Sequence, residues 1–177
     1  LPTLSFAVLQ VMFLSSLALA AHWLANRSIG GLREIAVGSI AFTLGSALLF
    51  KMEASDGAAV ILLGQAMVLI GHLWVWLGIS DFWQIRQQQL VLLAGVVVAI
   101  AFASLGYQAV GGSPLAARSV TLSLFVAALS FGVVRTLVQA LGGRLGFYKG
   151  IVRRTTVGVG LAAGFFVVHA LFHLYHA

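Results

Sequence analysis

The chain has 177 residues, of which 61% are hydrophobic and 8% are charged, and its mean hydropathy is +1.07. A soluble domain carries roughly 25% charged residues, so this composition excludes an ordinary water-soluble fold. The net charge of +6 does not indicate a nucleic-acid partner, because the basic residues lie between apolar runs, as they do in membrane proteins. The absence of cysteine excludes disulfides, thiolate metal sites and cysteine nucleophiles.

Six apolar runs follow one another along the chain, each long enough for a helix that crosses a bilayer. Backbone groups in lipid must bond within the protein, which leaves helices or a closed barrel, and the runs lack the period-two alternation of a barrel. We therefore predict an all-α integral membrane bundle of about six transmembrane helices, forming one domain over residues 1–177. The expected spans are residues 3–26, 32–50, 58–79, 90–107, 115–141 and 155–176.

The links between the spans set the expected orientation. The links after the first, third and fifth spans carry seven basic residues, whereas the opposite links carry Lys51, with Arg118 just inside the fifth span. Because positive residues concentrate on the cytoplasmic side, we expect the N-terminus and residue 176 to lie outside the cytoplasm. The seven basic residues are Arg27, Arg33, Arg86, Arg144, Lys149, Arg153 and Arg154.

The first half of the chain carries helix-packing patterns that resemble a known family. Leu1-Pro-Thr opens the first span, and the second contains Gly31-Leu-Arg-Glu-Ile-Ala-Val-Gly and Leu44-Gly-Ser-Ala-Leu-Leu. The third contains Leu63-Gly-Gln, Leu69-Ile-Gly and Gly78-Ile-Ser-Asp-Phe. Over residues 1–82 these patterns resemble the N-terminal membrane sensor module of bacterial GGDEF diguanylate cyclases.

The resemblance implies a sensory domain in the bacterial cytoplasmic (inner) membrane. Such a module binds a ligand, forms a homodimer and regulates a C-terminal cytoplasmic cyclase that makes cyclic di-GMP. The Gly-Gly-Asp-Glu-Phe motif is missing from these residues, so we expect no catalytic activity from them. The chain begins without a methionine, so we expect it to be part of a longer protein. Six spans return the chain to the outside, so we expect a seventh span between Ala177 and the output domain.

Carboxylates are scarce and lie in or next to the links. This excludes paired-carboxylate catalysis and carboxylate proton relays inside the bilayer. The four acidic residues are Glu34, Glu53, Asp56 and Asp81.

Histidines supply the candidate metal ligands. His169, His173 and His176 are spaced i, i+4 and i+7, which places them on one stripe of a helix. Imidazoles one turn apart can bind the same metal, and imidazole is also the usual haem ligand. We predict a copper or zinc site here, joined by Gln65 at a similar depth and by Glu53 or Asp56. A haem, a quinone or another lipid-soluble ligand, and ordinary packing of the histidines, remain open alternatives.

Depth along the helices restricts the haem alternative. At 1.5 Å per residue, His72 and His169 are expected to differ in depth by roughly 12 Å, which disfavours them as opposite ligands of one haem. His22 is expected to lie within about 7 Å of the depth of His72. The alternative function is therefore an intramembrane redox protein that binds haem b or a metal.

Aromatic residues near these histidines predict a cavity for a planar hydrophobic ligand. Trp74 and Phe166 are further candidates, and core or lipid-facing packing is the alternative. Gly160-Leu-Ala-Ala-Gly164 matches GxxxG, for which we expect intramolecular packing rather than dimerisation. Arg118 could reach the lipid headgroups or bind an anionic group. The predicted ligand-binding set is Gln65, His72, Trp76, Phe165, His169 and Phe172.

Overall fold

The computed structural model describes residues 2–51, 57–85, 88–112, 114–142 and 149–175. These residues form six α-helices and no β-strand, which confirms the predicted all-α fold. The helices are α1 (Pro2–Ala25), α2 (Leu32–Lys51), α3 (Ala58–Phe82), α4 (Gln88–Val110), α5 (Leu115–Gly142) and α6 (Lys149–Tyr175).

Five helices contain a stretch that is long and apolar enough to cross a membrane. The stretches are residues 7–25, 32–50, 58–82, 91–110 and 117–141. Over the part of the chain that the structure describes, α6 is not among them, so the sixth span remains a prediction. Helix α6 also begins at Lys149 rather than at residue 155 as expected.

The chain divides into two compact units, Leu1–Gly78 and Ile79–Ala177. The first contains α1, α2 and most of α3, and the second contains α4, α5 and α6. The expectation that the whole chain is one domain remains a prediction, and each unit is described by itself.

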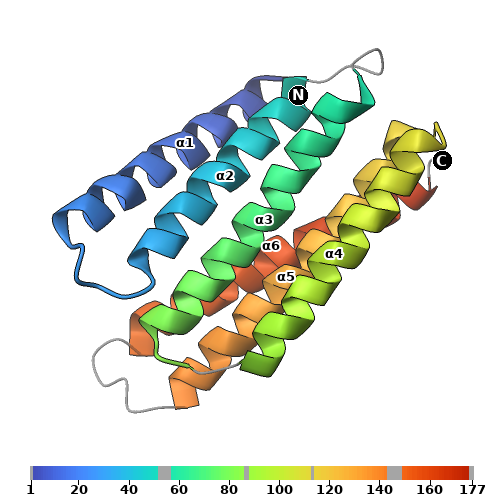
Figure 1. Ribbon diagram of the computed structural model, residues 1–177. Helices are drawn as coiled ribbons and strands as arrows, with labels where there is room; N and C mark the ends of the chain where they lie inside the picture. The colour runs from blue at the N-terminus through green and yellow to red at the C-terminus, as the bar shows by residue number, and fades with distance from the viewer. Residues whose placement is uncertain (1, 52–56, 86–87, 113, 143–148, 176–177) are drawn as a thin grey trace. The chain divides into compact units, whose positions relative to one another are not determined.

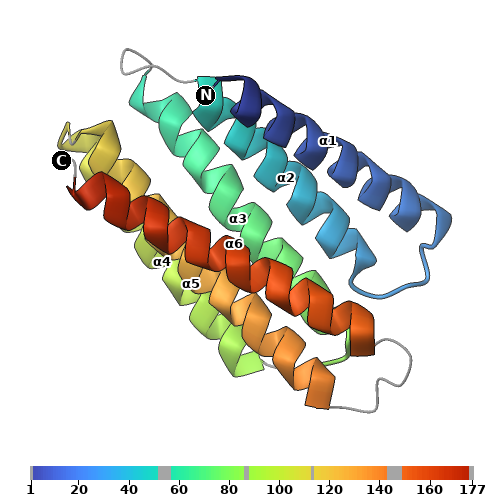
Figure 2. The ribbon, with the colours of Figure 1, turned by 180° about the vertical axis from the view of Figure 1, so that it is seen from behind.

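In the first unit, α2 lies between α1 and α3 (Figures 1 and 2). Glycines recur every seven residues in the α2 and α3 segments and meet in antiparallel order. A Cβ placed on Gly38 would lie 2.7 Å from the Gly71 carbonyl oxygen, and one on Gly45 would lie 2.7 Å from that of Gly64. Since real Cβ atoms do not approach backbone atoms so closely, this contact requires glycine.

A third glycine pair lies where α2 begins. A Cβ on Gly78 would lie 2.5 Å from the Gly31 carbonyl oxygen, and Gly31 has a φ of 77°, which also favours glycine. A strict seven-residue repeat keeps the same faces of two helices in contact when they form a left-handed supercoil. The six glycines therefore hold the backbones of α2 and α3 close together along most of their length.

Helix α1 contacts α2 through a buried pair of hydroxyl groups. Ser16 Oγ lies 2.9 Å from Thr43 Oγ1, and it also lies 3.1 Å from the Ser39 carbonyl oxygen. Ser16 and Thr43 are 4% and 5% exposed, respectively, whereas Val11 and Leu14 on the same helix are 63% and 64% exposed. The hydroxyl pair is therefore the polar attachment of an otherwise exposed helix.

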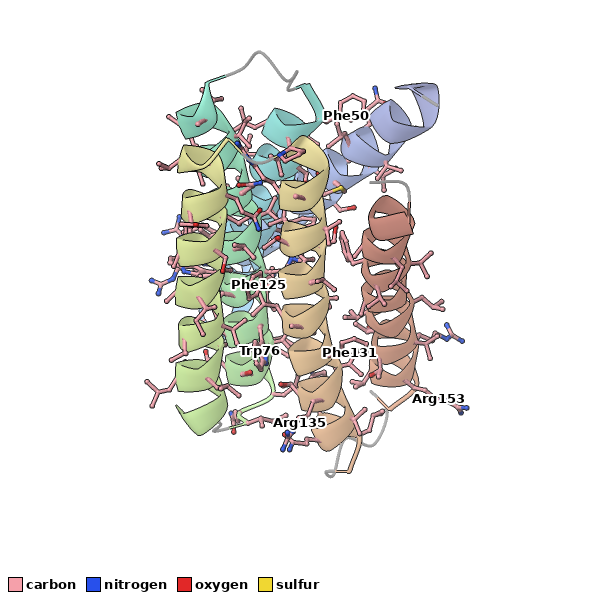
Figure 3. All side chains as sticks on the ribbon, turned by 90° about the vertical axis from the view of Figure 1, so that its right-hand side faces the viewer. Phe50, Trp76, Phe125, Phe131, Arg135 and Arg153 are labelled. Atoms are coloured by element: carbon pink, nitrogen blue, oxygen red, sulfur yellow. The ribbon has the colours of Figure 1, made fainter. Side chains whose placement is uncertain are left out.

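In the second unit, α5 packs against both α4 and α6 (Figure 3). Its buried residues include small polar ones, and Thr136, which is fully buried, donates a hydrogen bond to the Gly132 carbonyl oxygen at 3.1 Å. Bonding within the same helix is a common way for a hydroxyl in an apolar environment to be satisfied.

The expected close packing at the GxxxG motif is not found among the described residues. A Cβ placed on Gly160 or Gly164 would meet no atom within 4 Å. Among the described residues, the motif match in α6 therefore shows no close approach of a second helix, unlike the seven-residue glycine repeat of α2 and α3.

The glycine contact predicts opposite effects of one substitution at two sites. Gly38→Ala should lower the free energy of unfolding by about 1–3 kcal/mol, because the new Cβ overlaps backbone atoms of α3. Gly95→Ala in α4 is the matched control, because a Cβ there would meet no atom within 4 Å, and stability should stay equal or rise by up to about 1 kcal/mol. Denaturant unfolding in detergent micelles measures both, and equal losses for the two variants would contradict the contact.

Candidate functional site

Three of the predicted ligand-binding residues lie on one stripe of α3. Gln65, His72 and Trp76 are seven and four residues apart, so they share a helical face. Gln65 is 3% exposed and Trp76 is 7% exposed, while His72 is partly buried. Trp74 lies on another face of the helix and is 39% exposed, so it does not belong to this α3 stripe.

Gln65 contains an acceptor that is not satisfied. Its Oε1 is buried and has no hydrogen-bond partner among the described residues. A buried polar atom in this condition costs about 1–3 kcal/mol relative to one that is hydrogen-bonded. Because a carbonyl oxygen can only accept, its partner would be a donor: a bound molecule, a water or a group outside the described residues.

The position of His72 depends on the glycine contact between α2 and α3. Its ring lies edge-on to that of Phe42 on α2, with ring centroids 4.8 Å apart and an angle of 65° between the planes. A Cβ on the neighbouring Gly71 would lie only 2.5 Å from the Phe42 backbone nitrogen. The absent side chain at residue 71 thus lets the α2 backbone come close enough to set Phe42 against the imidazole.

The predicted histidine stripe of α6 is not tested. Phe165, His169, Phe172 and His173 belong to α6, but their side chains lie outside the described part of the structure, as does the whole of His176. The possible carboxylate ligands Glu53 and Asp56 also lie outside the described residues.

Among the side chains that are described, no three His, Cys, Asp or Glu residues form a group that could hold a metal ion. Gln65 and His169 belong to different units. Their expected similarity in depth therefore remains a prediction, and so does the metal site.

His22 takes part in a local contact at the end of α1. Its Nδ1 lies 3.3 Å from Asn26 Nδ2, which also donates to the His22 carbonyl oxygen at 3.0 Å. The residue is exposed, and α2 lies between α1 and α3. These contacts stabilise the C-terminal end of α1. They give no support for pairing His22 with His72.

A second polar cluster joins α4 and α5, and Arg118 alone among its members was a candidate from the sequence. Gln108 Nε2 donates to Thr121 Oγ1 at 2.8 Å, and Arg118 Nη2 lies 3.5 Å from the Ala109 carbonyl oxygen. Arg118 is 7% exposed, so it is buried beside α4 instead of extended to the surface. The signal in the sequence was the presence of polar residues in the turns that flank the Gly111-Gly-Ser-Pro link.

An apolar groove between α1 and α2 was also not predicted. It has a volume of about 290 Å³. It is lined by Leu9, Gln10, Phe13, Thr43, Leu44, Ala47 and Phe50.

Comparison with known proteins identifies no relative. A scan of protein-family models, a search of curated proteins and a search of solved structures each found no match.

The α3 stripe predicts an unusual stability effect at Gln65. In detergent without added ligand, Gln65→Leu should raise the free energy of unfolding by about 1–3 kcal/mol, because it removes a buried acceptor that lacks a donor. Gln10→Leu is the control, since Gln10 is exposed on α1 and should change stability little. A loss of stability in Gln65→Leu, measured by denaturant unfolding, would show that Oε1 is satisfied inside the protein.

Proposed function

We propose that the chain is a membrane-embedded sensory, ligand-binding domain of a bacterial signalling protein that regulates a cytoplasmic diguanylate cyclase. The ligand-binding part rests on Gln65 Oε1, which is buried without a partner among the described residues and lies on the same stripe of α3 as His72 and Trp76. The link to cyclic di-GMP rests on the resemblance of residues 1–82 to the membrane modules of GGDEF proteins.

Apolar surface supports a multi-pass protein of the cytoplasmic membrane. Besides the five apolar helices, large hydrophobic side chains are exposed, such as Leu92 at 72% and Leu161 at 72%. Soluble proteins rarely leave contiguous apolar faces in water. In a bilayer these side chains contact lipid.

The distribution of charge supports an N-terminus outside the cytoplasm. In the second unit, Arg135 lies toward the end of α5, and Arg153 lies near the start of α6 (Figure 3). Both flank the link of residues 143–148, which the positive-inside rule assigns to the cytoplasm.

The α3 stripe favours a hydrophobic ligand that carries one hydrogen-bond donor. A hydroxyl or N–H group would donate to Gln65 Oε1. The rest of the molecule would extend along the helix toward the His72 imidazole and the indole of Trp76, which lies about 16 Å from Gln65 along the axis. A ligand of this kind enters from the membrane.

Signalling requires that the ligand bind one of two helix arrangements more tightly than the other. A ligand with equal affinity for both arrangements would not change the equilibrium between them. The closely packed α2–α3 pair would move as a rigid element, with α1 attached to it. The chain would act as a homodimer.

Cyclic di-GMP in cells tests this function. With the full-length protein expressed at equal amounts, Gln65→Leu should change the cyclic di-GMP level by up to about tenfold, since losing about 1.4 kcal/mol of ligand binding alters an equilibrium by that factor. Gln10→Leu should leave the level unchanged. The proposal is wrong if no GGDEF domain follows the membrane spans or if the two variants behave alike.

The alternative function is an intramembrane redox protein with haem b or a bound metal. His169 and His173 one turn apart on α6 favour it, because this spacing suits shared metal ligation. The purified protein would then show a reducible Soret absorption band that is lost in His72→Ala or His169→Ala, or would contain copper or zinc that is lost in His173→Ala. The absence of both signals from protein isolated in its native membrane would contradict this alternative.

A further inference from the structure

The α4–α5 cluster consists of Gln108 and Ala109 in the last turn of α4, and Arg118 and Thr121 near the start of α5. Two contacts cross between the helices, one from Gln108 to Thr121 and one from Arg118 to Ala109. The α4 partners are adjacent in the chain, and the α5 partners are three residues apart, which is about 4.5 Å along the axis. Both contacts therefore belong to one small region of the second unit.

The hydrogen-bond pattern fixes the orientation of the Gln108 amide. Thr121 Oγ1 donates its single proton to the Ala117 carbonyl oxygen at 3.0 Å, so it can only accept from Gln108. The amide nitrogen of Gln108 must then face Thr121. Its Oε1 consequently points elsewhere, where it is buried without a partner among the described residues.

Arg118 brings an uncompensated positive charge to the same region. It is 7% exposed, its Nε has no partner among the described residues, and its contact with Ala109 lies at the outer limit for a hydrogen bond. The sequence of α4, α5 and α6 contains no carboxylate. Asp81, the only acidic residue in the second unit, precedes the start of α4, about 34 Å of helix away from its end.

The ends of two helices meet at Arg118. It lies in the first turn of the 28-residue α5, where unpaired N–H groups carry partial positive charge, and beside the last turn of α4, whose carbonyl groups carry partial negative charge. Neither helix end supplies the full negative charge with which a buried arginine is normally paired. Among the described residues, the cluster therefore lacks an anionic acceptor for Arg118 Nε and a donor for Gln108 Oε1.

We propose that the α4–α5 cluster binds a phosphate group that carries its own hydrogen-bond donor. A phosphate oxygen accepts from Arg118 Nε, and an O–H or N–H of the same ligand donates to Gln108 Oε1. Hydrogen phosphate from solution and a phosphoethanolamine lipid headgroup both have this combination. A plain carboxylate or sulfate satisfies the arginine but leaves the glutamine without a donor. This site is separate from the α3 stripe and does not depend on the function proposed for it.

Calorimetric titration of the purified full chain, stripped of lipid in detergent, tests the soluble source. Inorganic phosphate should bind, and Arg118→Gln and Arg118→Lys should each weaken binding by about tenfold or more, since the contact from Arg118 Nε is lost. Gln108→Leu should reduce the affinity for phosphate to that for sulfate. Arg135→Gln is the matched control, because Arg135 lies on the same helix and is exposed.

Native mass spectrometry of the chain with lipid retained tests the membrane source. If the headgroup is the ligand, phosphatidylethanolamine should stay bound to the unaltered chain and to Arg135→Gln, and should be lost from Arg118→Gln.

Two results would overturn the proposal. In the first, substitution of Arg118 changes the binding of neither phosphate nor phospholipid. That result would mean that water or α4 carbonyl groups satisfy the guanidinium. In the second, Arg118→Gln and Arg135→Gln weaken binding equally, which indicates attraction to the net charge alone. Far-ultraviolet circular dichroism checks that each variant keeps its helices. Gln108→Leu retains the arginine, so its affinity for phosphate relative to sulfate tests the second contact separately.

Discussion

The close contact between the backbones of α2 and α3 positions the rest of the first unit. Lipid tails are as apolar as leucine, so helices in a bilayer associate through packing and hydrogen bonds. Glycine pairs such as Gly38–Gly71 let the two helices approach until their backbones touch. This close approach places the Phe42 ring of α2 against the His72 ring of α3. On the side of α2 that faces α1, the hydroxyl groups of Ser16 and Thr43 join α1 to α2.

Polar side chains in the interior are few, and some of them are only partly satisfied. Ser16 and Thr136 bond to neighbouring groups, as hydroxyl groups in apolar surroundings usually do. Gln65, Gln108 and Arg118 each keep a buried atom without a partner among the described residues. Apolar residues at these positions would avoid that free-energy cost. We propose that bound molecules complete these hydrogen bonds, one against α3 and another between α4 and α5.

The apolar runs of the sequence were enough to predict the helices. All six appear near their expected positions, because a continuous apolar segment leaves few alternatives to a helix. Helix α6 begins earlier than predicted, at Lys149, and so includes the charged Arg153 and Arg154 that precede its apolar part. Charged residues that remain exposed do not stop a helix from extending beyond its apolar part.

Contacts between helices were harder to predict. The glycines of α2 and α3 stand out in the sequence as helix-packing patterns, but their seven-residue spacing alone does not determine which glycine of α2 meets which of α3. The Gly160–Gly164 motif shows the opposite error, since its spacing fits close packing and no helix approaches it among the described residues. The Gln108–Thr121 bond depends on the rotation of two helices about their axes, which hydropathy does not determine.

The central claim is that Gln65 marks a ligand site on α3. The most direct measurement is an experimental structure of the full-length protein isolated from its native membrane without added ligand. We predict a bound non-protein molecule with a donor atom within about 3.5 Å of Gln65 Oε1, extending along the helix toward His72 and Trp76. A structure in which Oε1 accepts a hydrogen bond from the protein or from a lone water, with no ligand against this stripe, would contradict the account.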